Sequence, residues 1–246
     1  MKSLEAVIVS VNYSDILAHT LPHNKQFFNR VVVVTDTKDD LTYNLCRNLQ
    51  VQCIRTDVFY DKGSKFDKGA GITEGLKHLT QDEWVLQMDT DIWLHPFCMQ
   101  QLRSLPLIST NIYGCDRVMV ESFNDWIRFL NEPNLWNPEF WMLNMDRFKI
   151  GSRLTFYWSG DAWNVLGFFQ LWNPKISGVN YYPSFTDASS SDIVFSQLWP
   201  RVKRHLIPEM LAIHIEEGQS QTGRNWQGRP TLNFFPQNYN NGSITQ

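Results

Sequence analysis

Residues 84–91, Trp-Val-Leu-Gln-Met-Asp-Thr-Asp, decide the fold, because a short apolar run ends there in two carboxylates. Two earlier apolar runs, residues 6–11 and 31–34, are rich in β-branched residues. Runs of this kind are typical of strands that are buried on both faces of a parallel sheet. Residues 41–49 and 69–79 lie between these runs and are predicted to be helical. The alternation predicts an α/β fold, an α/β/α sandwich with a mostly parallel central sheet.

Composition excludes a largely disordered chain. The 246 residues are 43% hydrophobic, 14% aromatic and 19% charged, whereas disordered chains are poorer in aromatic residues and richer in charge. The net charge of −3 argues against a purely electrostatic nucleic-acid binder. No clear linker is present, so we expect a single domain over residues 1–246. Its halves divide at about residue 120, the second half runs to about 230, and a tail over 231–246 is expected to fray.

The sequence shows no signal-peptide core and no run of about 18 apolar residues that would cross a membrane. The four cysteines form no Cys-x-x-Cys pair, so we expect reduced and mostly buried thiols. These observations predict a cytoplasmic location and no membrane partner.

Polar residues follow each predicted strand. Asn12 and Tyr13 follow the first, Asp36 ends the second, and Asp89 and Asp91 end the third. In open α/β sheets, ligands bind outside the carboxyl ends of the strands, so these residues outline one rim of a binding crevice. The first strand is not followed by a Gly-x-Gly-x-x-Gly motif, and no P-loop is present, which argues against those two nucleotide sites.

The Asp89-Thr90-Asp91 segment is the sharpest feature. Two carboxylates at a strand end bind a hard divalent cation such as Mg²⁺ or Mn²⁺, which often shares its ligands with phosphate oxygens. About one Asp-x-Asp is expected by chance in this chain. The apolar runs on both sides of the segment raise its significance.

In the order and separation of these segments, the chain resembles the nucleotide-diphospho-sugar glycosyltransferases of the GT-A fold. The resemblance covers residues 5–120 well and the remainder more loosely, and it includes residues 62–71, which look like the family's stretch before the acidic motif. It implies a metal-dependent transfer of sugar from a nucleotide-diphosphate sugar to an acceptor hydroxyl. The small size resembles that of free-standing bacterial or phage enzymes.

The resemblance implies a set of donor and metal residues. For the nucleotide sugar these are Asn12, Tyr13, Asp36, Lys65, Lys68, Asp89, Thr90 and Arg229. Tyr13 would offer an aromatic face to the base. The lysines recur every three residues from Lys62 as a cationic stripe that could face phosphates. Arg229 and Arg224 are alternatives to the lysines in that role. For Mn²⁺ or Mg²⁺ the ligands would be Asp89, Asp91 and His214.

The second half would bind the acceptor. Asp192 is the expected catalytic base if the reaction inverts the anomeric centre, and its place at the start of a helix over residues 193–199 would keep it ionised. Asp187 and Asp161 are alternatives, and a retaining reaction would need no such base. Six of the ten tryptophans lie in residues 126–172. Aromatic rings stack on sugars and bases. This block occupies the region where the family that the chain resembles binds its acceptor, so the resemblance implies an acceptor site on Phe169, Gln170 and Trp172.

The leading function is therefore a hexosyl- or pentosyltransferase. Its acceptor is a glycan, a protein, a small molecule or a hydroxymethylated DNA base. Two alternatives stay open: a nucleotidyltransferase that makes a sugar nucleotide, and a noncatalytic carbohydrate-binding protein that uses the aromatic block.

Overall fold

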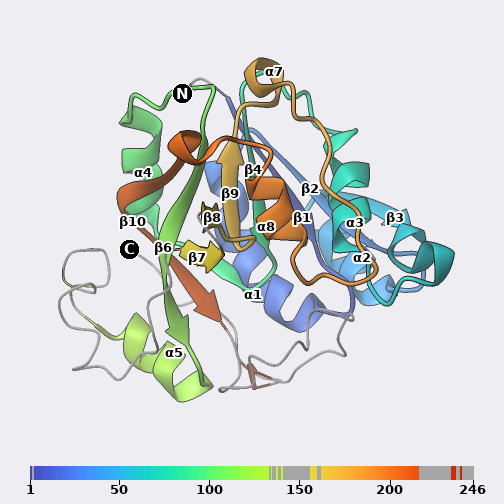
Figure 1. Ribbon diagram of the computed structural model, residues 1–246. Helices are drawn as coiled ribbons and strands as arrows, with labels where there is room; N and C mark the ends of the chain where they lie inside the picture. The colour runs from blue at the N-terminus through green and yellow to red at the C-terminus, as the bar shows by residue number, and fades with distance from the viewer. Residues whose placement is uncertain are drawn as a thin grey trace.

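The computed structural model describes residues 1, 3–132, 134, 137, 140, 156–159, 162–215, 234–236 and 239. Among them, one sheet consists of β1 (Leu4–Val9), β2 (Arg30–Asp36), β3 (Gln52–Thr56), β4 (Trp84–Asp89), β5 (Ile92–Leu94), β6 (Ile112–Val120), β9 (Phe169–Trp172) and β10 (Arg204–Ile215). The order across this eight-stranded sheet is β3-β2-β1-β4-β9-β6-β10-β5 (Figure 1). A separate pair is formed by β7 (Phe156–Ser159) and β8 (Ala162–Val165).

The helices of the described residues are α1 (Ser14–Asn24), α2 (Asp40–Asn48), α3 (Lys68–Leu76), α4 (Pro96–Ser104), α5 (Phe123–Leu130), α7 (Pro174–Ser177) and α8 (Ser191–Ser196). The described residues also form three short 3₁₀ helices, η1 (Lys25–Phe27), η2 (Val58–Gly63) and η3 (Arg201–Lys203). Aspartate side chains cap two of the helices. Asp39 accepts a hydrogen bond from the Thr42 N–H, and Asp67 accepts one from the Ala70 N–H.

The three apolar runs of the sequence form β1, β2 and β4, as predicted, and these strands pair in parallel. The register places Val9 of β1 opposite both Val34 of β2 and Asp89 of β4. The carboxyl ends of the three strands therefore meet at one edge of the sheet. Four of the seven pairings in the sheet are parallel, which confirms the mostly parallel prediction.

Strands from the second half of the chain extend the same sheet. β9 is antiparallel to both β4 and β6, and β10 runs parallel to β6. β10 also pairs with the short β5 in antiparallel register, with His214 opposite Ile92. The Ile215 N–H donates to the Asp91 carbonyl at 2.8 Å. These pairings bring the end of β10 beside the residues that follow β4.

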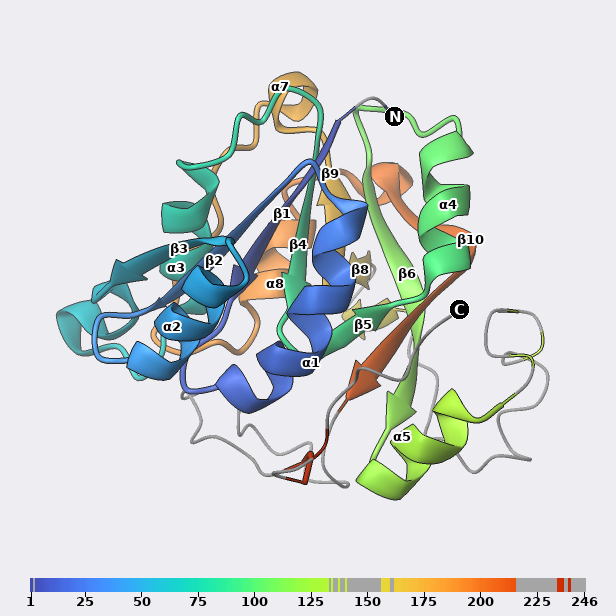
Figure 2. The same cartoon turned by 180° about the vertical axis from the view of Figure 1, so that it is seen from behind.

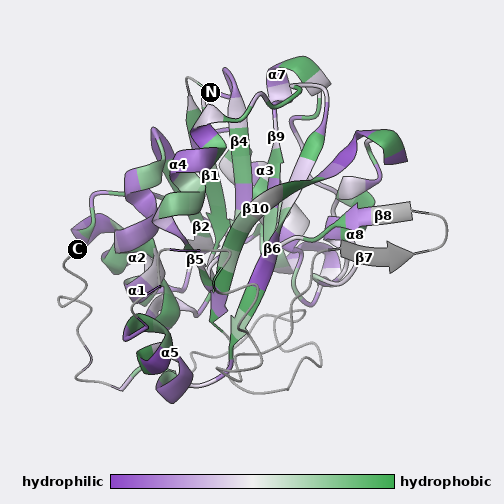
Figure 3. Cartoon of the chain, turned by 90° about the vertical axis from the view of Figure 1, so that its left-hand side faces the viewer, coloured by the Kyte–Doolittle hydropathy of each residue, from purple (hydrophilic) through white to green (hydrophobic). Residues whose placement is uncertain are grey.

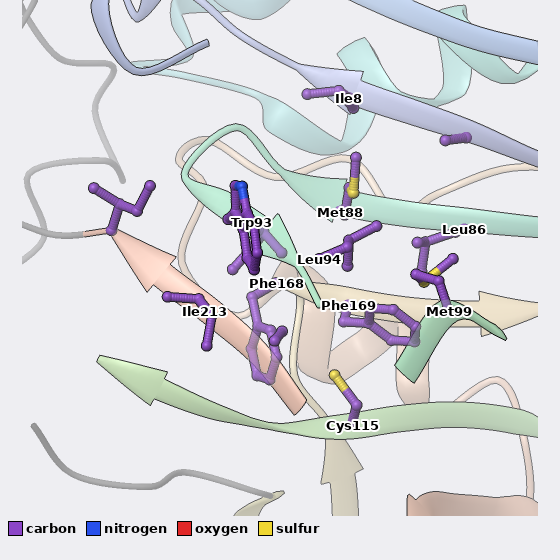
Figure 4. Close-up of a cluster of buried hydrophobic side chains, with 14 of the residues drawn as sticks. Ile8, Leu86, Met88, Trp93, Leu94, Met99, Cys115, Phe168, Phe169 and Ile213 are labelled. Carbon is purple, nitrogen blue, oxygen red and sulfur yellow. The ribbon is translucent and has the colours of Figure 1, made fainter. Parts of the chain in front are cut away.

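Helices cover both faces of the sheet, which confirms the three-layer prediction. The first apolar core includes side chains of α1, α2, α4 and α5, and the first three of these helices lie in front of the sheet in Figure 2. The second core includes side chains of α3, η2 and α8. Figure 3 shows hydrophobic colour concentrated on the central strands between these layers, and Figure 4 shows part of the first core.

Two local predictions are wrong. Helix α8 begins at Ser191, ends at Ser196 before the predicted end at residue 199, and has no side-chain cap at Ser190. The tail was expected to fray, but its described residues Phe234 and Phe235 are only 5% and 7% exposed because they pack into the first core.

The four cysteines carry free thiols, and three of them are buried, as expected. None of the described helices combines the length and the hydrophobicity that crossing a bilayer requires.

Candidate active site

Asp91 is the most enclosed of the predicted metal ligands, with 2% of its surface exposed. Its Oδ2 accepts a hydrogen bond from the Tyr13 hydroxyl at 3.0 Å, and its Oδ1 lies 3.2 Å from Nε2 of His214. Burial acts to raise the pKa of this carboxyl, but His214 and the Lys68 ammonium outweigh it and hold the pKa below its usual value. Asp91 is therefore a carboxylate at neutral pH.

His214 reaches Asp91 because β10 ends beside it. The imidazole is 7% exposed, and its Nδ1 lies 2.7 Å from Nη1 of Arg117 on β6. The Arg117 guanidinium also lies over the Phe168 ring, 4.6 Å from the ring centroid. Sequence reasoning missed Arg117, because an arginine inside an apolar strand has no motif around it.

Asp89 forms an ion pair with Lys68 at the start of α3. Its backbone N–H donates to the Phe168 carbonyl at 3.3 Å, and Gln87 Nε2 lies 3.4 Å from its Oδ1. Burial acts to lower the pKa of Lys68, but Asp89 and the more distant Asp192 and Asp91 raise it overall. The structure thus joins Asp89 and Lys68, two residues that the sequence analysis assigned to donor binding.

The residues present fit a divalent cation. Asp91 Oδ1 and His214 Nε2 lie 3.2 Å apart, yet neither atom has a hydrogen-bond partner. Adjacent ligands of an octahedral ion with bonds of about 2.1 Å lie roughly 3 Å apart. A carboxylate oxygen together with an imidazole nitrogen suits Mn²⁺, and carboxylate oxygen also suits Mg²⁺. Among the described residues, no three His, Cys, Asp or Glu side chains form a preassembled cluster, because Asp89 is turned to Lys68.

The predicted nucleotide residues lie at the ends of β1 and β2. Asn12 is exposed, has a φ of 53°, and donates its N–H to Asp39 at 2.7 Å. Asp36 is 7% exposed and accepts the Lys38 N–H at 2.8 Å. Sequence reasoning missed Asp39, which also accepts the Thr35 hydroxyl at 2.9 Å and so connects both strand ends to α2. Its position at the start of a predicted helix was the available signal.

Tyr13 and Thr90 do not have the predicted roles. Tyr13 is 8% exposed and packs in the first core, so it offers no aromatic face to a base and instead binds Asp91. Thr90 is 3% exposed, its hydroxyl donates to the Val9 carbonyl at 2.9 Å, and its own carbonyl accepts the Thr20 hydroxyl at 2.7 Å. Thr90 therefore fixes the backbone between the two aspartates.

The predicted lysine stripe does not form. The backbone of Lys62 is in the left-handed region, with a φ of 55°. Lys65 is an exposed loop residue whose N–H donates to the Thr186 carbonyl at 2.7 Å. Lys68 alone of the three contacts a site carboxylate in the described structure. Arg224 and Arg229 lie outside the described residues, as does Asp161.

Asp192 lies in the first turn of α8 and faces Gly167. Its Oδ2 accepts the Gly167 N–H at 2.9 Å, and its Oδ1 accepts the Ile193 N–H at 2.8 Å. Burial raises the pKa of Asp192 above the usual value, and the hydrogen bond from Gly167 and the charge of Lys68 only partly oppose this.

The predicted acceptor residues are core residues. Phe169, Gln170 and Trp172 all lie on the central strand β9 and have no exposed surface, and Figure 4 shows Phe169 among the side chains of the first core. Gln170 has a positioning role instead. Its amide N–H donates to the Asp192 carbonyl at 3.0 Å, and its carbonyl oxygen accepts the Tyr182 hydroxyl at 2.6 Å. The acceptor expectation is therefore wrong for these three side chains.

Comparison with known proteins matches residues 5–163 to the family described as Glycosyl transferase family 2. Comparison with curated protein sequences finds no match.

Two solved structures are similar in fold, both of glucosyl-3-phosphoglycerate synthase from Mycobacterium tuberculosis. The complex with Mn²⁺, UDP-glucose and phosphoglyceric acid has a TM-score of 0.52 at 10% identity and covers 92% of this chain and 76% of that one. The complex with Mn²⁺, UDP and glucosyl-3-phosphoglycerate has a TM-score of 0.50 at 11% identity, with coverage of 92% and 76%.

The contact between Gly167 and Asp192 yields a prediction. In a Gly167→Ala variant the new Cβ would lie 2.7 Å from Asp192 Cβ and 3.1 Å from Oδ2, so the carboxyl must move. We expect a loss of about 1–3 kcal/mol in the free energy of unfolding, measured with urea. The pKa of Asp192, followed by NMR, rises further because the hydrogen bond from Gly167 stabilises the charged form.

Gly178→Asn is the matched control. Gly178 has a φ of 73° and open space around the position of a Cβ, and asparagine tolerates that backbone conformation. An unchanged Asp192 pKa in Gly167→Ala would contradict the role given to Gly167.

Proposed function

The chain belongs to glycosyl transferase family 2, and on that premise we propose that this GT-A glycosyltransferase uses Mn²⁺ or Mg²⁺ to transfer a sugar from a nucleotide-diphosphate sugar to an acceptor hydroxyl. One observation carries the proposal: Asp91 Oδ1 and His214 Nε2 face each other at 3.2 Å with no hydrogen-bond partner. They lie at the edge of the sheet where the strand ends meet. The similar mycobacterial enzyme has been crystallised with Mn²⁺ and UDP, which supports the same classes of ligand here.

Asp91 and His214 would hold the cation, which supplies Lewis-acid stabilisation of the departing diphosphate. The Tyr13 hydroxyl fixes the orientation of Asp91 through Oδ2 and leaves Oδ1 for ligation. Lys68 places its ammonium on Asp89 at the same edge. That ammonium would stabilise phosphate oxygens of the donor, and the Asp89 carboxylate would be a third ligand of the cation. Asn12 and Asp36 contact the nucleoside part of the donor.

Asp192 is the proposed general base for an inverting reaction. Gly167 and Ile193 each donate a backbone N–H to it, so the carboxylate has a fixed orientation. A base whose pKa is raised toward the working pH removes a hydroxyl proton more readily than an ordinary aspartate does. Asp187, the alternative, has a lowered pKa because the Ser189 hydroxyl and N–H bind it.

Membership of this family favours sugar transfer over the nucleotidyltransferase and carbohydrate-binding alternatives. The acceptor is a hydroxyl-bearing molecule. A hydroxymethylated DNA base, a phage-like origin and a cytoplasmic location stay predictions from the sequence.

An Asp91→Asn variant tests the metal site. Asparagine keeps the shape of the side chain and removes its charge, so we expect Mn²⁺ binding to weaken about 100-fold or more. The rate at which the variant hydrolyses or transfers sugar from a panel of nucleotide sugars should fall as Mn²⁺ binding weakens. Isothermal titration with Mn²⁺ and product analysis measure the two effects.

Asp82→Asn, at an exposed position, is the control and should bind Mn²⁺ as the wild type does. Undiminished Mn²⁺ binding by Asp91→Asn would remove the metal site from the proposal.

The pH dependence tests Asp192. The base must be ionised, so activity is lost as the pH falls through the folded pKa of Asp192. Burial raises that pKa, and the acidic limb of the kcat/KM profile should lie above about 3.9, the ordinary value for aspartate. Asp192→Asn should lower kcat by about 10²–10⁴-fold, and Asp187→Asn should lower it little. An Asp192→Asn enzyme with a normal rate and an unchanged acidic limb would exclude Asp192 as the base.

A further inference from the structure

Arg117 contacts the imidazole of His214, the proposed metal ligand, at the ring nitrogen that does not face Asp91. Within β6 it is the one residue that is not buried. Its guanidinium lies over the Phe168 ring, and its Nη1 lies 2.7 Å from Nδ1 of His214. Arg117 thus acts on His214 at the nitrogen opposite to the one that faces Asp91.

The hydrogen-bonding chemistry of Arg117 and His214 determines which ring nitrogen of the imidazole carries the proton. A guanidinium is always charged and has only donors, so at 2.7 Å the Nδ1 atom of His214 must accept. An imidazole that accepts at Nδ1 carries its proton on Nε2, which lies 3.2 Å from Asp91 Oδ1 without making a hydrogen bond to it.

This arrangement is the opposite of the usual support for a metal-binding histidine. Such a histidine donates its second N–H to a carboxylate or a carbonyl, which leaves the lone pair of the other nitrogen for the metal. Arg117 instead engages the lone pair of Nδ1 and holds the proton on Nε2, where a cation would bind.

We propose that Arg117 is a positioning residue that holds His214 in the tautomer unable to ligate, so that it must leave Nδ1 when the cation binds. The inference rests on the proposed function, because it takes the cation between Asp91 and His214 as given. The affinity of the enzyme for metal alone is therefore lower than its ligands would otherwise give.

The first test reads the tautomer directly. In the metal-free wild-type protein labelled with ¹⁵N-histidine, long-range ¹H–¹⁵N NMR distinguishes a protonated ring nitrogen from an unprotonated one. The His214→Gln spectrum assigns the resonances. We expect the proton of His214 on Nε2 in the wild type and a shift of population toward Nδ1 in Arg117→Met. A wild-type proton on Nδ1 would overturn the inference.

The second test measures the affinity for Mn²⁺ alone by calorimetry or by electron paramagnetic resonance. Arg117→Met keeps an apolar stem over Phe168 and removes the donors and the charge. We expect it to bind Mn²⁺ about 10-fold more tightly than the wild type. Arg128→Met, at a half-exposed arginine on α5 that pairs with Asp125, is the matched control and should bind as the wild type does.

A double-mutant cycle separates action through His214 from a general change in structure. In a His214→Gln background, Arg117→Met should no longer tighten Mn²⁺ binding, because the imidazole on which it acts is gone. Equal or weaker Mn²⁺ binding by Arg117→Met overturns the inference, and the proposed metal site stands if Asp91→Asn still loses Mn²⁺. If Asp91→Asn retains Mn²⁺, the proposed metal site itself fails. Thermal unfolding checks that each variant folds. If Arg117→Met does not fold, the tautomer of His214 in the wild-type protein alone tests the inference.

Discussion

The site depends on the close approach of Asp91 and His214, two residues that strand pairing brings together although they lie far apart in the sequence. His214 reaches its position because β10 pairs in parallel with β6 and in antiparallel register with β5, and because the Ile215 N–H donates to the Asp91 carbonyl at 2.8 Å. The backbone ladder thus sets the distance between the two side chains. A buried carboxylate oxygen and a ring nitrogen with no hydrogen-bond partner are costly to maintain, and a bound cation offsets that cost.

Lys68 connects the two chemical parts of the site. Its ammonium pairs with Asp89, and the charges of Asp192 and Asp91 also act on its pKa. The ammonium offsets part of the negative charge that these carboxylates carry. The negative charge that remains at this edge favours a divalent cation. A substitution at Lys68 would therefore change the pKa of both Asp91, the proposed metal ligand, and Asp192, the proposed base.

The first half of the fold was predictable because buried parallel strands leave a strong pattern. Continuous β-branched residues predicted β1 and β2, and the polar ends of the strands predicted the edge at which the site lies. The roles of Phe169 and Trp172 could not be derived, because an aromatic residue in a sequence is equally suited to a core and to a binding face. Their place on the central strand β9 decides it. The role of Arg117 could not be predicted for a different reason. Its partner His214 lies far along the chain, and only the β6–β10 pairing brings the two residues together.

The proposed metal site depends most directly on His214 as a nitrogen ligand of the cation. Pulsed electron paramagnetic resonance of Mn²⁺ bound to the protein detects a directly ligated imidazole nitrogen through its hyperfine coupling. The account predicts a nitrogen coupling in the wild type that changes as expected on ¹⁵N-histidine labelling and disappears in His214→Gln. A Mn²⁺ spectrum with no nitrogen coupling, or one that His214→Gln leaves unchanged, would contradict it.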